Sequence, residues 1–158
     1  MAPNLRFPER AVVQSARALK HAKAEQFSSF DVEAFEPPGG RDELWRFTPL
    51  RRLRGLHDGS APRTADATIT VSEQTGVTVE TVQRGDERLG EGGIPADRVA
   101  AQAFSSFQQA TIVTVGRAVH TDAPVEITVT GPGVGQTAYG HLQIRAGELA
   151  EAVVVMDL

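Results

Sequence analysis

Few residues of this chain have the types and the spacing that catalysis requires. Ser105 or Ser106 could act as a nucleophile, because a serine hydroxyl attacks once a neighbouring base takes its proton. His120 could be that base, and Asp122 could orient it. No G-x-S-x-G elbow surrounds the two serines, and residues 119–124 hold an aspartate and a proline that favour a surface turn. We therefore predict no catalytic residue and expect that the chain is not an enzyme.

Metal and cofactor chemistry has equally little support in the sequence. The chain contains no cysteine, so thiolate metal sites and disulfides are excluded. The histidines, which form no H-x-x-x-H pair, are His21, His57, His120 and His141. Glycine-rich residues 131–135 could suggest a phosphate loop, but Pro132 removes a backbone donor, and Gln136 stands where the dinucleotide fingerprint needs glycine. We predict a turn there, no metal ligand and no bound cofactor.

A cluster of aromatic and basic residues could serve binding instead. Trp45 and Phe47 are types that occur at protein interfaces, but large aromatic side chains more often pack in a core. Arg51, Arg52 and Arg54 could contact an anion, yet leucines occupy the other face of their short predicted helix. We predict packing for the two aromatic side chains and a solvated face for the three arginines.

The distribution of charge bears on the kind of partner. Residues 1–63 hold 11 Lys/Arg against 8 Asp/Glu, whereas residues 64–158 hold 5 against 12. Nucleic-acid binding needs a concentrated basic surface, so the acidic majority favours protein partners. The N-terminus has no apolar signal region, and no stretch approaches the ~20 apolar residues of a membrane span. We predict a cytoplasmic protein without nucleic-acid or membrane binding.

The elements that would position these residues begin with a helical head. Apolar residues at helical spacing predict a helix over residues 9–26, and an irregular connector follows. Thr48 can cap a second helix whose first position is Pro49, and this helix should end after two turns near Gly55. The breaker-rich residues 57–63 end the head.

Strands dominate the rest of the chain. Alternating apolar residues over 67–71 and 77–79 predict a β-hairpin, and Asp97 can cap a helix that ends near Gln108. Its apolar side would hold Val99, Ala103, Phe104 and Phe107. Four further strands are expected at residues 111–115, 125–130, 139–145 and 152–156. Their spacing suits either a sandwich or the rungs of a β-helix.

The last residues, 153–158, would leave a strand uncovered. A solenoid normally carries a capping unit, because its final rung exposes apolar side chains and unpaired backbone groups. We therefore expect a truncated chain that can self-associate through this open β end.

One segment resembles a known family. The segment is residues 30–53, which ends in Glu-Leu-Trp-Arg-Phe-Thr-Pro-Leu-Arg-Arg-Leu, with an acidic residue ahead of the aromatic block. This pattern resembles the N-terminal signature of the SufD family of iron-sulfur cluster assembly proteins. The residues of the signature are Trp45, Arg46, Phe47, Thr48 and Pro49. The resemblance extends over nearly the whole chain, which would be the N-terminal portion of a SufD-like protein.

The resemblance implies a fold and a division of the chain. Full-length relatives have a helical N-terminal lobe, a central right-handed parallel β-helix and a helical C-terminal lobe. The fold class is then α+β, with a small helical lobe followed by a β-rich region that begins a truncated right-handed parallel β-helix. Residues 1–62 would be the helical lobe, 63–110 the entry segment and 111–158 the first rungs.

The resemblance also implies a function. SufD pairs with SufB and the ATPase SufC, and it serves as a scaffold or accessory subunit rather than as the catalyst. The iron-sulfur cluster and ATP would be handled through those partners, and this piece would bind neither and be inactive alone. The signature residues Trp45 to Pro49 would be structural.

Two other functions stay open. A stand-alone interaction module would use the helical head for binding and keep its last strand covered. A β-helical carbohydrate-active enzyme would place several carboxylates along one sheet face, whereas the predicted strands hold isolated acids such as Glu126.

Overall fold

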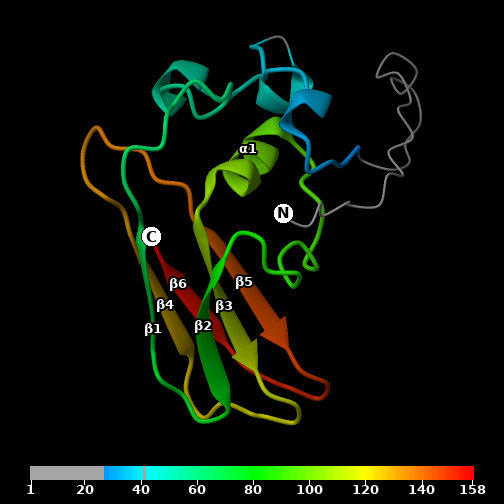
Figure 1. The fold of residues 1–158 in the computed structure, drawn as a ribbon, viewed down its shortest axis with the longest axis vertical. Coiled ribbons are helices and arrows are strands. Elements are labelled where there is room, and N and C mark those ends of the chain that lie inside the picture. The colour runs from blue at the N-terminus through cyan, green and yellow to red at the C-terminus, as the bar shows by residue number, and fades with distance from the viewer. Residues whose placement is uncertain (1–26, 41) are drawn as a thin grey trace, which may run out of the picture.

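A computed structural model describes residues 27–40 and 42–158 of the chain. Two three-stranded sheets face each other, and a short α-helix and several tight turns lie at one end of them (Figure 1). The strands are β1 (Thr68–Val71), β2 (Val77–Gln83), β3 (Gln109–Val115), β4 (Val125–Thr130), β5 (His141–Ala146) and β6 (Val154–Asp157). The helices are α1 (Arg98–Ser106) and the 3-10 turns η1 (Val32–Ala34), η2 (Glu43–Trp45) and η3 (Leu50–Leu53).

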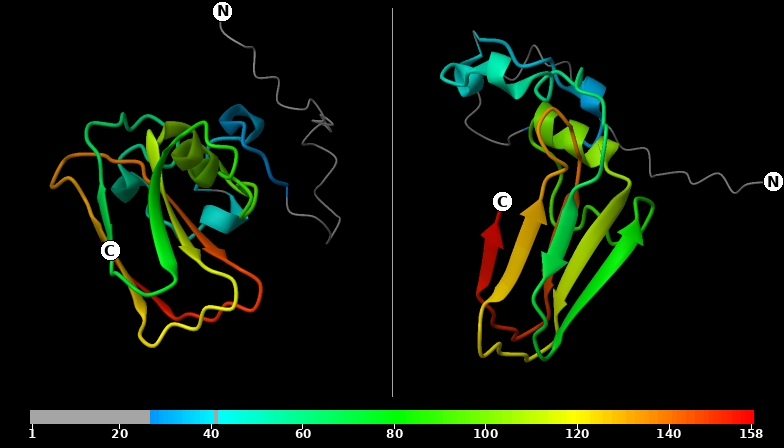
Figure 2. Two further views of the ribbon diagram at one scale, coloured as in Figure 1. Left: turned by 60° about the horizontal axis from the view of Figure 1, so that its bottom comes forward. Right: turned by 90° about the vertical axis from the view of Figure 1, so that its left-hand side faces the viewer.

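The chain passes through both sheets twice in the same order. β3 lies in one sheet and β4 in the other, and β5 and β6 repeat that order. β5 pairs in parallel with β3, which aligns His141 with Ala110, and β6 pairs in parallel with β4. β1 pairs antiparallel with β4, and β2 pairs antiparallel with β3. In each sheet this antiparallel strand lies at the edge away from the second pass, so β1 is opposite β6 and β2 is opposite β5 (Figure 2). The second pass therefore lies directly beside the first.

The main core lies between the sheets. Val113 from β3 and Val125 and Ile127 from β4 are fully buried and form one cluster. The partly buried residues that pack against it are Ile69, Val71, Val77, Val129, Leu142 and Val154. Branched aliphatic side chains suit such a pleated surface, and alternate residues of each strand face the opposing sheet. Burial of this apolar surface joins the two sheets.

α1 closes one end of the sheets over a second, aromatic cluster. The Asp97 side chain accepts a hydrogen bond from the backbone N–H of Ala100 at 2.8 Å, so it caps the helix as predicted. Phe107, Ala110 and Tyr139 are the buried members of the cluster beneath the helix. No helix among the described residues is long and apolar enough to cross a membrane.

The predicted β-hairpin is wrong. β1 and β2 both form, but they lie in different sheets and pair with β4 and β3 instead of with each other. The alternation of Ile69 and Val71 with threonines indicates which face is buried and carries no information about the partner strand. The connection after β1 therefore crosses from one sheet to the other.

The predicted two-turn helix capped by Thr48 is also wrong. The structure has the short 3-10 turn η3, whose N-cap is Pro49 and which has no side-chain cap. The carbonyl of Thr48 accepts a hydrogen bond from the Leu50 N–H at 2.8 Å, so Thr48 belongs to a tight turn ahead of the helix. Arg54, at φ 48°, and Gly55, at φ 90°, then end the helix in the left-handed region.

The other expectations divide into three groups. The helix after Asp97 and the four last strands are confirmed, and so is the α+β character of the chain. The predicted helix over residues 9–26 lies outside the described residues. The right-handed parallel β-helix and the division at residues 62 and 110 stay predictions, because two passes of chain do not by themselves make a β-helix.

Candidate functional site

The surface that stands out is formed by two free strand edges. β5 is the last strand of one sheet and β6 the last of the other, and both continue the stacking direction of the second pass (Figure 2). Within the described part of the chain, no strand pairs with the outer edge of either. An uncovered edge presents a row of N–H and C=O groups that can accept a further strand. We call this surface the β5–β6 edge.

An apolar groove opens between the sheets on this side. Its volume is about 510 Å³. The apolar side chains in its lining include Ile69, Val129, Leu142, Ile144 and Met156. Ile144 is 43% exposed and Met156 49% exposed, although both belong to strands. The core of the two sheets is therefore open to solvent at the β5–β6 edge, as expected of a surface that binds protein.

A second groove, near β1 and β2, has a different character. Its volume is about 590 Å³, and polar side chains from both sheets contribute most of its lining. They include Thr68, Thr81, Gln83, Gln109 and Thr111. The same two sheets thus present a polar groove in one place and an apolar groove at the β5–β6 edge.

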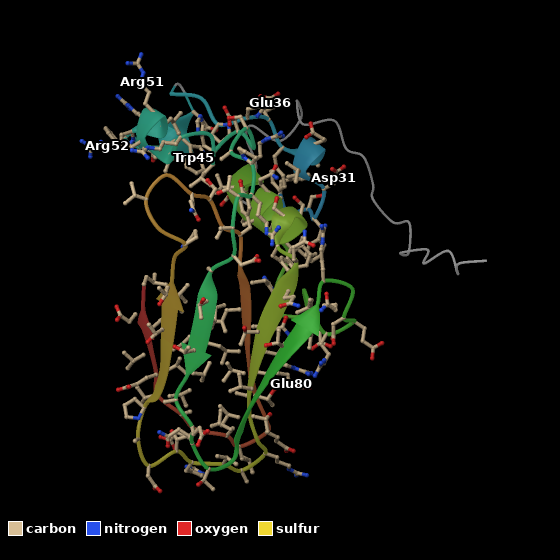
Figure 3. The ribbon with its side chains drawn as sticks, turned by 60° about the vertical axis from the view of Figure 1, so that its left-hand side comes forward. Asp31, Glu36, Trp45, Arg51, Arg52 and Glu80 are labelled. Carbon is tan, nitrogen blue, oxygen red and sulfur yellow. The ribbon has the colours of Figure 1, made fainter. Side chains whose placement is uncertain are left out.

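A charged loop covers the outer face of the β2–β3–β5 sheet. Arg88 donates to Asp86 at 2.8 Å and to Glu80 of β2 at 2.8 Å (Glu80 is labelled in Figure 3). The hydrogen bonds from Arg88 lower the pKa of the Asp86 carboxyl to about 2. Gln143 of β5 donates to the Arg88 carbonyl, and Arg145 pairs with Glu91 at 3.1 Å. The loop is therefore fixed to the edge strand β5 by polar contacts.

His141 begins β5 beneath the aromatic cluster. Its ring stacks on Phe107 at 4.9 Å between centroids and meets the edge of Phe104 at 5.2 Å. Burial lowers the pKa of this histidine, and its Nε2 atom is buried without a hydrogen-bond partner among the described residues. The environment therefore favours the neutral ring, which acts here as an aromatic packing group.

The candidate catalytic group of Ser105, Ser106, His120 and Asp122 is not assembled. The two serines lie on α1, where they bond to Gln102. His120 lies on the turn that follows β3, at the far end of that strand, and its Nδ1 is 3.2 Å from the Glu151 carboxylate. This turn is exposed, as the sequence predicted.

Metal and phosphate sites receive no support from the geometry. No group of three or more His, Cys, Asp or Glu side chains within residues 27–40 and 42–158 is placed to hold a metal ion. Residues 131–135 form a loop between β4 and β5, with a turn bond from the Gln136 N–H to the Gly133 carbonyl at 3.3 Å. The predicted turn between strands is therefore correct.

The family-signature residues lie in the head, above α1 (Figure 3). Trp45 and Thr48 are half-buried, whereas Arg46 and Pro49 are exposed. Phe47 is 88% exposed, so the prediction that it packs in the head is wrong for this side chain. Its ring instead lies beside the Arg46 guanidinium, 5.4 Å from the centroid. Arg51, Arg52 and Arg54 are exposed, as predicted.

Sequence reasoning did not identify the arginine that fastens the head to α1. Arg98, at the start of α1, is buried and donates to the carbonyls of Val32 and Phe35 at 2.9 and 2.8 Å. It also pairs with Glu33 at 3.1 Å. These contacts fasten η1 to the helix. A lone arginine beside a helix cap is usually solvated, so only the three-dimensional contacts reveal this role.

Known proteins match most of the chain. Iron-sulfur cluster assembly SufBD family proteins of Mycobacterium bovis and Mycobacterium tuberculosis are 68% identical to it over 143 residues. That of Mycobacterium leprae is 66% identical over 135 residues. The chain is homologous to SufBD family proteins.

The match covers a much larger share of this chain than of its relatives. It includes 90% of this chain and 36% of the M. bovis and M. tuberculosis proteins, so the chain spans about a third of the length of these SufBD relatives. For the M. leprae protein the shares are 85% and 34%. No family profile matches the chain, and no solved structure matches it significantly.

Proposed function

We propose that this chain is part of a SufD-type scaffold subunit of an iron-sulfur cluster assembly complex, and that it has no enzymatic activity of its own. The names of its homologues support a role in iron-sulfur cluster assembly. The observation that carries the scaffold proposal is the parallel pairing of β5 with β3 and of β6 with β4. The subunit would then act by presenting binding surfaces for the other proteins of the complex in fixed positions.

The pairing supports a specific extension of the fold. Each pass of the chain adds one strand to each sheet, and each new strand leaves a free edge on the same side. A third pass could add its strands to β5 and β6 and cover Ile144 and Met156. Repetition of that step would give the right-handed parallel β-helix of the SufD resemblance.

The partners proposed from the resemblance are SufB and SufC in the cytoplasm. This chain contains no cysteine, so thiolate ligands for a cluster would have to come from outside this sequence. ATP would be bound by SufC, and the cluster would be cargo of the complex. Of the signature residues, the half-buried Trp45 and Thr48 would have an architectural part in the head.

Co-purification tests the partner assignment. The gene product that carries this chain would be tagged and co-expressed with the SufB and SufC homologues of the same organism. We expect a complex that survives size-exclusion chromatography and contains all three proteins. A folded, monodisperse protein that elutes without either homologue would contradict the proposal.

The β5–β6 edge leads to a second part of the proposal, which is self-association of the isolated chain. Strand edges next to an exposed apolar groove can pair with another copy. Light scattering over a tenfold concentration range should show a mass that rises with concentration. Ile144→Lys, in the groove, should abolish this rise. Val134→Lys, at a fully exposed residue of the β4–β5 loop, should preserve it.

The opposite result would favour another function. A strict monomer at every concentration would contradict an open β edge, and it would support the stand-alone interaction module.

A further inference from the structure

We propose that the head carries a docking surface for an acidic protein segment. The surface is a patch on and around η3, away from the β5–β6 edge. Its residues are Arg46, Phe47, Arg51, Arg52 and Arg54, and we call it the arginine–phenylalanine patch. The inference does not depend on the proposed scaffold function, because the patch shares no residue with the strand edges.

The first observation is exposure. Phe47 is 88% exposed, and Arg51 and Arg52 point away from the body of the molecule (Figure 3). The Arg46 guanidinium lies 5.4 Å from the Phe47 ring centroid, which holds a cation beside the ring. An exposed aromatic ring beside an arginine has the composition of an interface hot spot.

The second observation is unbalanced charge. No aspartate or glutamate occurs between Glu43 and Asp58, while four arginines do. Elsewhere in the described chain, five arginines each pair with a carboxylate: Arg63, Arg88, Arg98, Arg117 and Arg145. Within the same residues, no ion pair involves any of the four arginines of the patch. Their charge is therefore not neutralised by any carboxylate among the described residues.

The third observation is a fixed backbone. Arg54 and Gly55 end η3 in the left-handed region, and a Cβ on Gly55 would clash with the Ser60 hydroxyl oxygen. The Ala61 N–H donates to the Gly55 carbonyl at 3.1 Å, and the Ala61 carbonyl accepts from the Tyr139 hydroxyl at 2.8 Å. The segment after the patch is thus tied to the aromatic cluster, which limits the loss of entropy on binding.

These observations favour an acidic protein segment over a nucleic acid or a membrane. Residues 64–158 hold 5 basic against 12 acidic residues, so a long polyanion that extended past the patch would meet repulsion. A short segment with carboxylates around one apolar side chain would satisfy the arginines and cover the Phe47 ring. The opposite charges would also speed the encounter.

Selection from a displayed library of random peptides tests the inference. The full chain would be the bait, and enriched peptides would be synthesised and titrated by fluorescence anisotropy. We expect them to combine two or more acidic residues with an apolar one. Arg51→Glu and Phe47→Ala should each weaken binding about tenfold or more, and binding should weaken as salt rises.

The matched control is Arg117→Glu, which makes the same charge change at an exposed arginine after β3 and should leave the affinity within about twofold. Thermal unfolding would confirm that each variant is folded, as expected for exposed positions. Peptides without acidic residues, or affinities that Arg51→Glu and Phe47→Ala leave unchanged, would overturn the inference. So would tighter binding of a duplex DNA oligonucleotide or of phosphatidylglycerol vesicles in the same buffer.

Discussion

The two sheets and the head of this molecule are stabilised in different ways. Between the sheets, Val113, Val125 and Ile127 are fully buried and pack against one another. In the head, η1 and η3 contain no buried residue, and η1 is fastened by the hydrogen bonds of Arg98. Burial of apolar surface is cooperative and non-directional, whereas a guanidinium fixes particular carbonyl groups. Damage to the sheets should therefore be global, and damage to the head local.

The largest effect is expected from the core between the sheets. Ile127→Ala leaves a cavity at a fully buried site and should lower the free energy of unfolding by about 2–5 kcal/mol. Urea denaturation followed by circular dichroism measures this change. Thr128→Ala, the exposed neighbour on β4, should stay within ~0.5 kcal/mol. A loss below ~1 kcal/mol for Ile127→Ala would show that the sheets are not held together by this cluster.

The head should respond to the loss of one arginine. Arg98→Met leaves the carbonyls of Val32 and Phe35 without their donor. It should lower the free energy of unfolding of the head by about 1–3 kcal/mol and affect the sheets less. Hydrogen exchange should become faster over residues 27–38 while β3 and β4 keep their protection. Arg117→Met, which removes an exposed ion pair with Glu148, serves as the control. Equal loss of protection in head and sheets would refute the local nature of the effect.

His141 joins the two regions and should make stability depend on pH. Burial lowers its pKa in the folded state, so the unfolded chain binds a proton more readily. Stability is then constant above about pH 6.5 and falls as the pH drops below that value. His141→Phe keeps an aromatic ring and should flatten the dependence between pH 7 and 5. Urea midpoints measured at several pH values would test this expectation. If the midpoint of His141→Phe fell with pH as steeply as that of the unmodified chain, His141 would not be the source of the pH dependence.

The smallest effect is expected from the exposed charges on the outer face of the sheet. Asp86 has a folded-state pKa of about 2, below the ordinary value of 3.8. Its contribution is therefore present above about pH 4 and is lost as the pH falls toward 2. Asp86→Asn should lower the melting temperature at pH 7 by only about a degree or two, and less in high salt. A drop comparable to that of Ile127→Ala would mean that the loop, too, is part of the core.

The sequence predicted local structure better than it predicted partners. The Asp97 cap and the β-branched runs identified α1 and the last four strands, because these signals act within a few residues. The same alternation in β1 and β2 suggested a hairpin, since period-two patterns fix the buried face and leave the pairing open. Thr48 matched a cap pattern that the turn at Pro49 overrides.

The candidate surfaces were only partly foreseen. An uncovered last strand was expected, and the structure adds a second free edge on β5 with an apolar groove between the two. Phe47 was expected to pack, because aromatic residues usually do, and its exposure follows from a backbone path that no local pattern encodes. Arg98 was missed for the same reason.

The pairing of the strands also has a consequence for the speed of folding. Thr68 of β1 pairs with Thr130 of β4, and even β2 and β3 are separated by a loop and α1. None of the strands in residues 42–158 can therefore find its neighbour through a short hairpin, and loop-closure entropy must be lost before their sheet contacts form. Such non-local topologies typically fold in about milliseconds to seconds. During synthesis, β1 and β2 would wait unpaired until β3 and β4 emerge, which makes this stage the one most exposed to aggregation.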